Sequence, residues 1–104
     1  MTPIASLELV QINPDGARRP ILVSIARPQP DNKGAWACPM FVDGLDSQER
    51  TIYGENSMQA LCQAIGMTRF HLKEALRMGN RLVWSGEDSN FDIDVIFGVL
   101  LGDS

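Results

Sequence analysis

The chain has 104 residues, of which 44% are hydrophobic and 21% charged, so we expect one soluble globular domain spanning residues 1–104. The formal net charge is −4, which excludes the overall basic surface typical of non-specific nucleic-acid binders. The N-terminus has no signal-peptide pattern, and no stretch approaches the roughly 20 apolar residues that span a bilayer. We therefore expect a cytoplasmic protein that does not enter membranes.

The first half of the chain has the pattern of four β-strands. Residues 4–12 and 21–25 are apolar and β-compatible, and the Asn-Pro-Asp-Gly cluster at residues 13–16 predicts a hairpin turn between them. Residues 35–42 and 50–53 predict two further strands after a proline-rich loop. Short connections between consecutive strands indicate an antiparallel meander.

A long amphipathic helix follows the fourth strand. Asn56 or Ser57 supplies the N-cap, and Gly79-Asn80 supplies the stop. The expected buried face consists of apolar residues at helical spacing, namely Met58, Leu61, Cys62, Ile65, Leu72 and Leu76. Arg69 falls inside this stripe and Gly66 lies in the helix interior. The helix is therefore either continuous, with the Arg69 head group reaching solvent, or broken near Gly66.

The last quarter of the chain begins with a fifth predicted strand at residues 81–85. Residues 91–95 alternate apolar and acidic side chains and predict a half-buried strand, whereas residues 95–101 fit either a strand or a short helix. Together the elements predict an α+β fold, in which one long amphipathic helix packs on one face of an antiparallel β-sheet that forms a meander.

The nucleophilic and titratable residues do not predict catalysis. His71 is the only histidine and lacks the motif context of a general base, so we expect an exposed surface residue. Cys38 and Cys62 are predicted to be buried, and neither has metal-ligand spacing to a histidine or to the other cysteine. We expect a protein that is not an enzyme and that has no cofactor and no metal.

The charge distribution is uneven along the chain. After Arg81 the chain carries five acidic residues and no basic residue. Such a segment can dock a cationic partner, although a solvated acidic surface is the simpler interpretation. The candidate partner-binding residues are Glu87, Asp88, Asp92 and Asp94.

Two other kinds of site are open at this point. Residues 57–78 resemble a helix-turn-helix with its turn at Gly66, although the acidic chain and the flanking strands oppose that interpretation. In it, the residues facing the major groove of DNA would be Arg69, Phe70, His71 and Lys73. A small-ligand pocket between the helix and the loops would instead be lined by Trp36, Tyr53 and Trp84.

Three segments carry a resemblance to a known family: Trp36-x-Cys38-Pro39, Tyr53-Gly54-x-Asn56-Ser57-x-Gln59-Ala60-Leu61 and Leu82-x-Trp84-x-Gly86. Over residues 36–86 the chain resembles a family of small bacterial proteins of unknown function, with Asn56 where aspartate is more usual. The resemblance implies one continuous helix over a sheet and weighs against the helix-turn-helix. It implies no activity, substrate or catalytic residue.

The expected function is a non-enzymatic protein-interaction module, such as an adaptor, an inhibitor or an immunity-type protein, whose partner is another protein. The alternatives are a DNA-binding regulator that uses residues 57–78 and a small-ligand-binding domain. An edge strand that pairs with a second copy would produce a homodimer.

Overall fold

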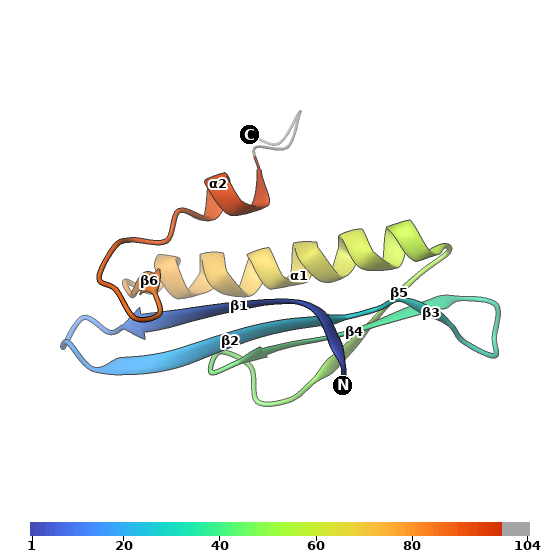
Figure 1. Cartoon of the computed structure of the whole chain (residues 1–104), viewed down its shortest axis with the longest axis horizontal. Coiled ribbons are helices and arrows are strands. Elements are labelled where there is room, and N and C mark those ends of the chain that lie inside the picture. Colours follow the sequence, from blue (N-terminus) through green and yellow to red (C-terminus); the bar gives the residue numbers. More distant parts are fainter. Residues whose placement is uncertain (99–104) are drawn as a thin grey trace.

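The computed structural model describes residues 1–98 and confirms the α+β fold, an antiparallel sheet with a long helix laid over it (Figure 1). Its elements are β1 (Pro3–Ile12), β2 (Arg18–Ala26), β3 (Gln29–Pro30), β4 (Trp36–Asp43), β5 (Arg50–Gly54), α1 (Ser57–Arg77), β6 (Arg81–Trp84) and α2 (Ile93–Phe97).

The sheet contains the predicted meander. β1 pairs with β2, β2 with β4, and β4 with β5, all antiparallel, and the short β3 also pairs with β4. The Asn13–Gly16 cluster makes the first hairpin turn, with Gly16 at a φ of 91°. β6 returns after α1 and pairs antiparallel with the side of β1 that β2 does not use. The β1–β2 pair therefore lies between β4 and β6.

The helix α1 is continuous from Ser57 to Arg77, so of the two alternatives left open by the sequence the unbroken helix is correct and the break near Gly66 is not. Asn56 is the N-cap and its side chain accepts a hydrogen bond from the Gln59 amide at 2.8 Å, while the Gln59 side chain accepts one from the Glu55 amide. Gly79, at a φ of 92°, lies just past the helix end as predicted. A continuous helix contains no turn, so the geometry that a helix-turn-helix needs is absent from residues 57–77.

The buried face of α1 differs from the predicted one. Its buried residues are mostly small: Ala60, Ala64, Thr68, Leu72 and Ala75. Of the predicted face only Leu72 is fully buried and Leu61 is partly buried, whereas Met58, Ile65 and Leu76 are 68%, 36% and 37% exposed and Cys62 is exposed. The cause is a close approach between the helix and the sheet, which small side chains permit and large ones prevent.

Gly54 lies at a point where α1 and the sheet approach each other closely. A Cβ atom added at Gly54 would lie 2.5 Å from the backbone nitrogen of Ala60 and 2.9 Å from its Cα atom. The helix therefore begins directly against the last residue of β5. The Tyr-Gly-x-Asn-Ser-x-Gln-Ala-Leu segment at residues 53–61 has a structural role here, because it supplies both this contact and the helix cap.

The strand predicted at residues 91–95 is not present in the structure. Residues 91–95 do not form a strand, because the Asp92 side chain caps α2 by accepting hydrogen bonds from the amides of Asp94 and Val95 at 3.0 and 3.4 Å. Phe91 is buried and packs edge-to-face against Trp84, with ring centroids 5.2 Å apart. Of the ambiguous residues 95–101, those up to Phe97 are helical, and residues 99–101 lie outside the described part of the chain.

Candidate functional site

One side of β1 is only partly paired. β6 pairs with residues Leu9 to Ile12, and the last hydrogen bond in this direction runs from the Ser85 amide to the Glu8 carbonyl oxygen at 3.3 Å. The chain then turns away at Gly86, which has a φ of 84°. Within residues 1–98, no strand pairs with residues 4–7 on this side, which we call the free edge.

The backbone of Ser6 points outward at the free edge. The Glu8 carbonyl faces β6, and backbone groups of alternate residues in a strand point to the same side. The N–H and C=O groups of Ser6 therefore point away from β2, and the residue is exposed. Such an edge can accept the backbone of an additional strand.

An apolar groove of about 480 Å³ lies beside the free edge. Its walls come from β1, β2, α1 and α2, and among residues 1–98 no charged residue lines it. The lining residues are Ile4, Ala5, Ser6, Leu7, Val23, Ile25, Leu61, Ile65, Thr68, Ile96 and Phe97. Successive side chains of a strand point to opposite faces, so a groove lined by four consecutive residues of β1 also touches the strand's backbone. The groove therefore opens onto the free edge.

Exposed apolar side chains surround this groove. Two of the lining residues are largely exposed, Ile4 of β1 at 57% and Ile96 of α2 at 46%, and the lining residue Ile65 of α1 is exposed as well. Val95, which precedes Ile96 on α2, is also exposed. Contiguous apolar surface from several elements is characteristic of binding sites on soluble proteins. The free edge and the groove thus form one candidate protein-binding site.

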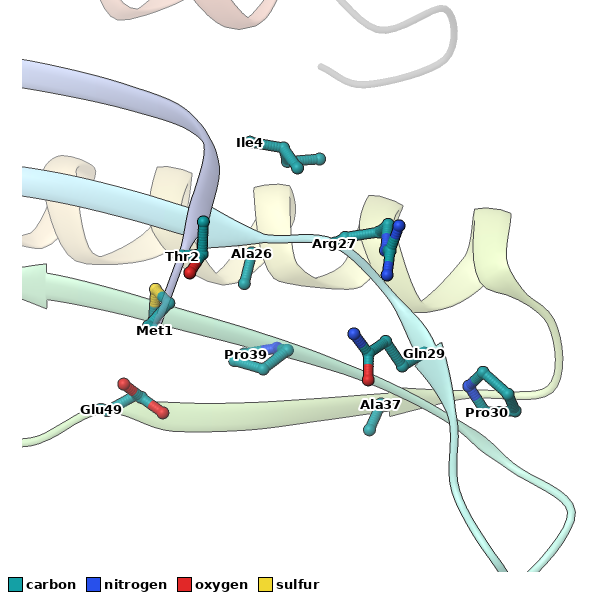
Figure 2. Close-up of a pocket in the computed structure, with 10 residues that line it drawn as sticks. All are labelled: Met1, Thr2, Ile4, Ala26, Arg27, Gln29, Pro30, Ala37, Pro39 and Glu49. Carbon is teal, nitrogen blue, oxygen red and sulfur yellow. The ribbon is translucent and has the colours of Figure 1, made fainter.

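A second cavity, of about 670 Å³, lies at the N-terminal end of β1 (Figure 2). Ala37 and Pro39 form part of its lining, and they face away from α1 because the alternate residues Cys38 and Met40 belong to the buried core. Arg27, Gln29 and Glu49 supply polar groups around it. This cavity has the mixed lining of a site for a small polar molecule.

Three of the predicted acidic residues, Glu87, Asp88 and Asp92, lie on the segment that connects β6 to α2, and Asp94 lies in the first turn of α2. All four already make contacts within the molecule. Asp88 forms an ion pair with Arg18 at 3.2 Å, and Asp94 forms one with Arg69 at 3.5 Å. Asp92 caps α2, and Glu87 accepts a hydrogen bond from the Ser89 hydroxyl at 3.0 Å. Part of the acidic charge is therefore neutralised within the molecule.

The structure does not bring the three predicted pocket aromatics together. Trp84 lies on β6 and packs against Phe91, whereas Trp36 lies on β4, on the other side of the β1–β2 pair. Tyr53 is exposed and lines a shallow hollow together with Lys33 and Gln59.

His71, in the C-terminal half of α1, belongs to a small charged cluster. Arg50 donates two hydrogen bonds to Asp46, at 2.8 and 3.0 Å, and the Nε2 atom of His71 lies 3.7 Å from the same carboxylate. Hydrogen bonds from Arg50, above all, hold the pKa of the Asp46 carboxyl well below its usual range. The predicted freely exposed histidine is thus a largely covered one, because its side chain is 23% exposed and faces the loop between β4 and β5.

Cys38 is buried as predicted. Its thiol donates a hydrogen bond to the Ala26 carbonyl oxygen at 3.3 Å, and burial raises the pKa of the thiol. A buried thiol with a raised pKa is a poor nucleophile. Among residues 1–98 there is no group of three side chains suited to a metal ion, and no helix long and apolar enough to cross a bilayer.

Comparison with known proteins identifies a family to which no activity is assigned. A family model described as a domain of unknown function (DUF6968) matches residues 8–95, from the middle of β1 into α2. No curated protein and no solved structure matches the chain. The matched span covers most of the sequence and the whole of α1, and the chain therefore belongs to the DUF6968 family of domains of unknown function.

Proposed function

We propose that this protein is a non-enzymatic protein-interaction module, acting as an adaptor, an inhibitor or an immunity-type protein, and that its binding site is the free edge of β1 with the apolar groove. The observation that carries the proposal concerns residues 4–7, whose side facing away from β2 is paired with no strand of the described chain and lies beside a groove that no charged residue of that part of the chain lines. These edge residues precede the span matched by the family model, so the proposed site is assigned to this chain rather than to the whole family.

Binding by strand addition uses the backbone and the groove together. A partner segment in extended conformation lies in line with β6, at the positions that β6 leaves when the chain turns at Gly86. Its backbone exchanges hydrogen bonds with Ser6, and every second side chain enters the groove toward Leu61 and Ile65. Backbone pairing provides affinity, and the apolar groove selects segments with apolar residues at alternate positions.

The acidic residues have a secondary part in the proposal. Glu8, Glu87 and Asp92 have no ion-pair partner within the described residues, whereas Asp88 and Asp94 do. Glu8 adjoins the free edge, and Asp92 precedes the helix that forms one wall of the groove. We expect a basic residue flanking the apolar segment of the partner to speed association at low salt. Neutralising Asp92 and Asp94 together should then slow association.

The proposal is tested with peptides selected from a phage-displayed library of random 12-residue sequences. Selected peptides should be apolar at alternate positions and should bind wild-type protein, as measured by fluorescence anisotropy. Ser6→Pro removes the outward N–H group without touching the ladder to β2, and it should weaken binding about tenfold or more. Ser6→Ala is the matched control and should bind like wild type. Selection of peptides whose affinity is equal for Ser6→Pro and wild type would refute the proposed site.

A small-ligand function is the second candidate, carried by the cavity in Figure 2. Arg27 and Glu49 both line it, and neither forms an ion pair with another described residue. Opposite charges around an apolar floor suit a zwitterion such as an amino acid. A thermal-shift series with the common amino acids tests this, and stabilisation that disappears in both Arg27→Ala and Glu49→Gln would favour it over strand addition.

Three expectations from the sequence belong to the proposal as well: that the protein acts in the cytoplasm, that its family is bacterial, and that the segment at residues 53–61 is a family signature. The DNA-binding alternative loses its structural support, because α1 is one unbroken helix and contains no helix-turn-helix. Binding to a mixed-sequence DNA duplex, measured in 50 mM salt, should therefore be undetectable.

A further inference from the structure

We propose that the strand accepted by the free edge is β1 of a second copy of this chain, giving a symmetric dimer with a continuous sheet. This inference rests on the proposed function, because it uses the same edge and the same groove. A second copy meets the requirements derived for a partner segment, since residues 4–7 are extended and uncharged, with Ile4, Ala5 and Ser6 exposed and Leu7 half-buried.

The backbone at Ser6 is self-complementary. When two antiparallel copies of β1 are related by a two-fold axis at Ser6, the N–H group of each Ser6 donates to the carbonyl oxygen of the other. Ala5 and Leu7, which lie on the α1 side of the sheet, then face Leu7 and Ala5 of the second copy. β1 has a register irregularity between Pro3 and Ala5, and Figure 1 shows the N-terminal end of the chain bending away from the line of the strand. The paired segment is therefore confined to residues 5–7, and the incoming chain must leave the edge before the position opposite Glu8, where Ser85 is already hydrogen-bonded.

The apolar side chains near the edge add to this contact. A continuous sheet places the two copies of α1 on the same face, so that exposed residues beside each groove approach those of the other copy. These residues are Ile4, Ile65, Val95 and Ile96, and they come from β1, α1 and α2. The dimer therefore buries apolar surface that a monomer leaves in water.

Charge does not oppose the pairing locally. Along the chain, Glu8 is the charged residue nearest to the paired segment, and the two-fold axis places the two Glu8 residues four positions apart along the joined strands. Four positions correspond to about 13 Å, which exceeds the Debye length of about 8 Å at physiological salt. Each copy carries a net charge of −4, however, so long-range repulsion makes self-association tighter as salt is added. A cationic peptide at the same site would show the opposite salt dependence.

The test is sedimentation equilibrium of the full chain from low micromolar to millimolar concentration, at low and high salt. We expect a monomer–dimer equilibrium that tightens with salt, that is weakened about tenfold or more by Ser6→Pro, and that is unchanged by Ser6→Ala. Ile65→Lys is a second variant, because it brings two like charges to the apolar contact and should also weaken the dimer. Far-UV circular dichroism and melting establish that each variant is folded.

Each other outcome has a definite meaning. A monomer at every concentration, or a dimer that Ser6→Pro and Ile65→Lys leave unchanged, overturns the inference. If the chain stays monomeric while library-selected peptides bind in a Ser6-dependent manner, the interaction module stands and only the second copy as partner is rejected. If dimerisation and peptide binding both occur, they must compete, because one free edge accepts one strand at a time.

Discussion

The packing of α1 on β5 predicts opposite effects for two glycine-to-alanine substitutions near the same helix. In Gly54→Ala the new Cβ atom lies 2.5 Å from the backbone nitrogen of Ala60, 2.9 Å from its Cα atom and 3.0 Å from the backbone carbon of Gln59. These are backbone atoms and cannot rotate aside, so the start of the helix must move by about 1 Å to restore an ordinary contact distance. Overpacking of this kind costs about 1–3 kcal/mol, and we expect a value near the upper end.

Gly66→Ala is the matched control. Gly66 is in the interior of α1, and an added Cβ atom meets nothing within 4 Å. Alanine has the higher helix propensity, so this variant should be more stable than wild type by about 0.5–1 kcal/mol.

Thermal and urea unfolding followed by circular dichroism at the helix band measure both changes. For a domain of this size, a loss of about 3 kcal/mol lowers the melting temperature by about 12–24 °C, and a gain of about 0.5–1 kcal/mol raises it by about 2–8 °C. If Gly54→Ala were as stable as wild type, the close approach of α1 to β5 would be refuted. If Gly66→Ala were destabilising, the interior of the helix would not be as open as the structure has it.

Three further predictions concern the core, the charged cluster and the cysteines. Leu72→Ala should lower the free energy of unfolding by about 2–5 kcal/mol in urea denaturation, because Leu72 is the large, fully buried side chain on the sheet-facing side of α1; a loss below 1 kcal/mol would contradict that burial. The pKa of Asp46 is lower in the folded state than the value of about 3.9 in the unfolded chain, so its carboxylate stabilises the fold above about pH 4, and this contribution disappears as the pH falls through the folded pKa. Asp46→Asn should therefore be less stable than wild type at pH 7, with a difference that narrows below about pH 4; a difference independent of pH between 2 and 7 would argue against the ion pair. Native protein should react with a thiol reagent at the exposed Cys62 only, and urea should expose Cys38 as well; rapid reaction of both cysteines in the native state would place Cys38 outside the core.

Features encoded within a few neighbouring residues could be predicted from the sequence. The turn at residues 13–16, the cap at Asn56 and the stop at Gly79 each depend on local backbone chemistry, and the structure places all three as expected. The meander followed because short connections leave consecutive strands as neighbours.

Features that depend on tertiary distances could not be predicted in this way. The large apolar residues Met58 and Ile65 suggested the buried face of α1, but the contact with Gly54 favours small side chains there, so Ala60 and Ala64 are buried instead. The alternation at residues 91–95 matched a strand, yet Asp92 satisfies helix amides and starts α2.

The candidate site was missed for a related reason. The residue types of β1 do not indicate which of its two sides is paired. None of the acidic and aromatic residues chosen from the sequence lines the groove, although Asp94 lies on α2, which forms one of its walls. One signal was present: the predicted strand at residues 4–12 is much longer than the one at residues 81–85. When a short strand pairs with a long one at the border of a sheet, part of the long strand stays unpaired on that side. Which part stays unpaired depends on the register between the two strands, and here the register is set by the packing of α1 and the turn at Gly86.

The exchange rate of the Ser6 amide proton tests the free edge most directly, because strand addition at β1 is the contact that gives this N–H group a hydrogen-bond acceptor. The rate is measured by NMR on isotope-labelled protein, first dilute and alone, then with a saturating library-selected peptide and at millimolar protein concentration. We predict fast exchange in the dilute protein, and exchange slowed at least about tenfold by the peptide and by the second copy. The Leu7 amide points toward β2 and should be slow throughout, which makes it the internal control. Fast exchange at Ser6 under all conditions, or slow exchange already in the dilute monomer, would contradict a free edge that binds a strand.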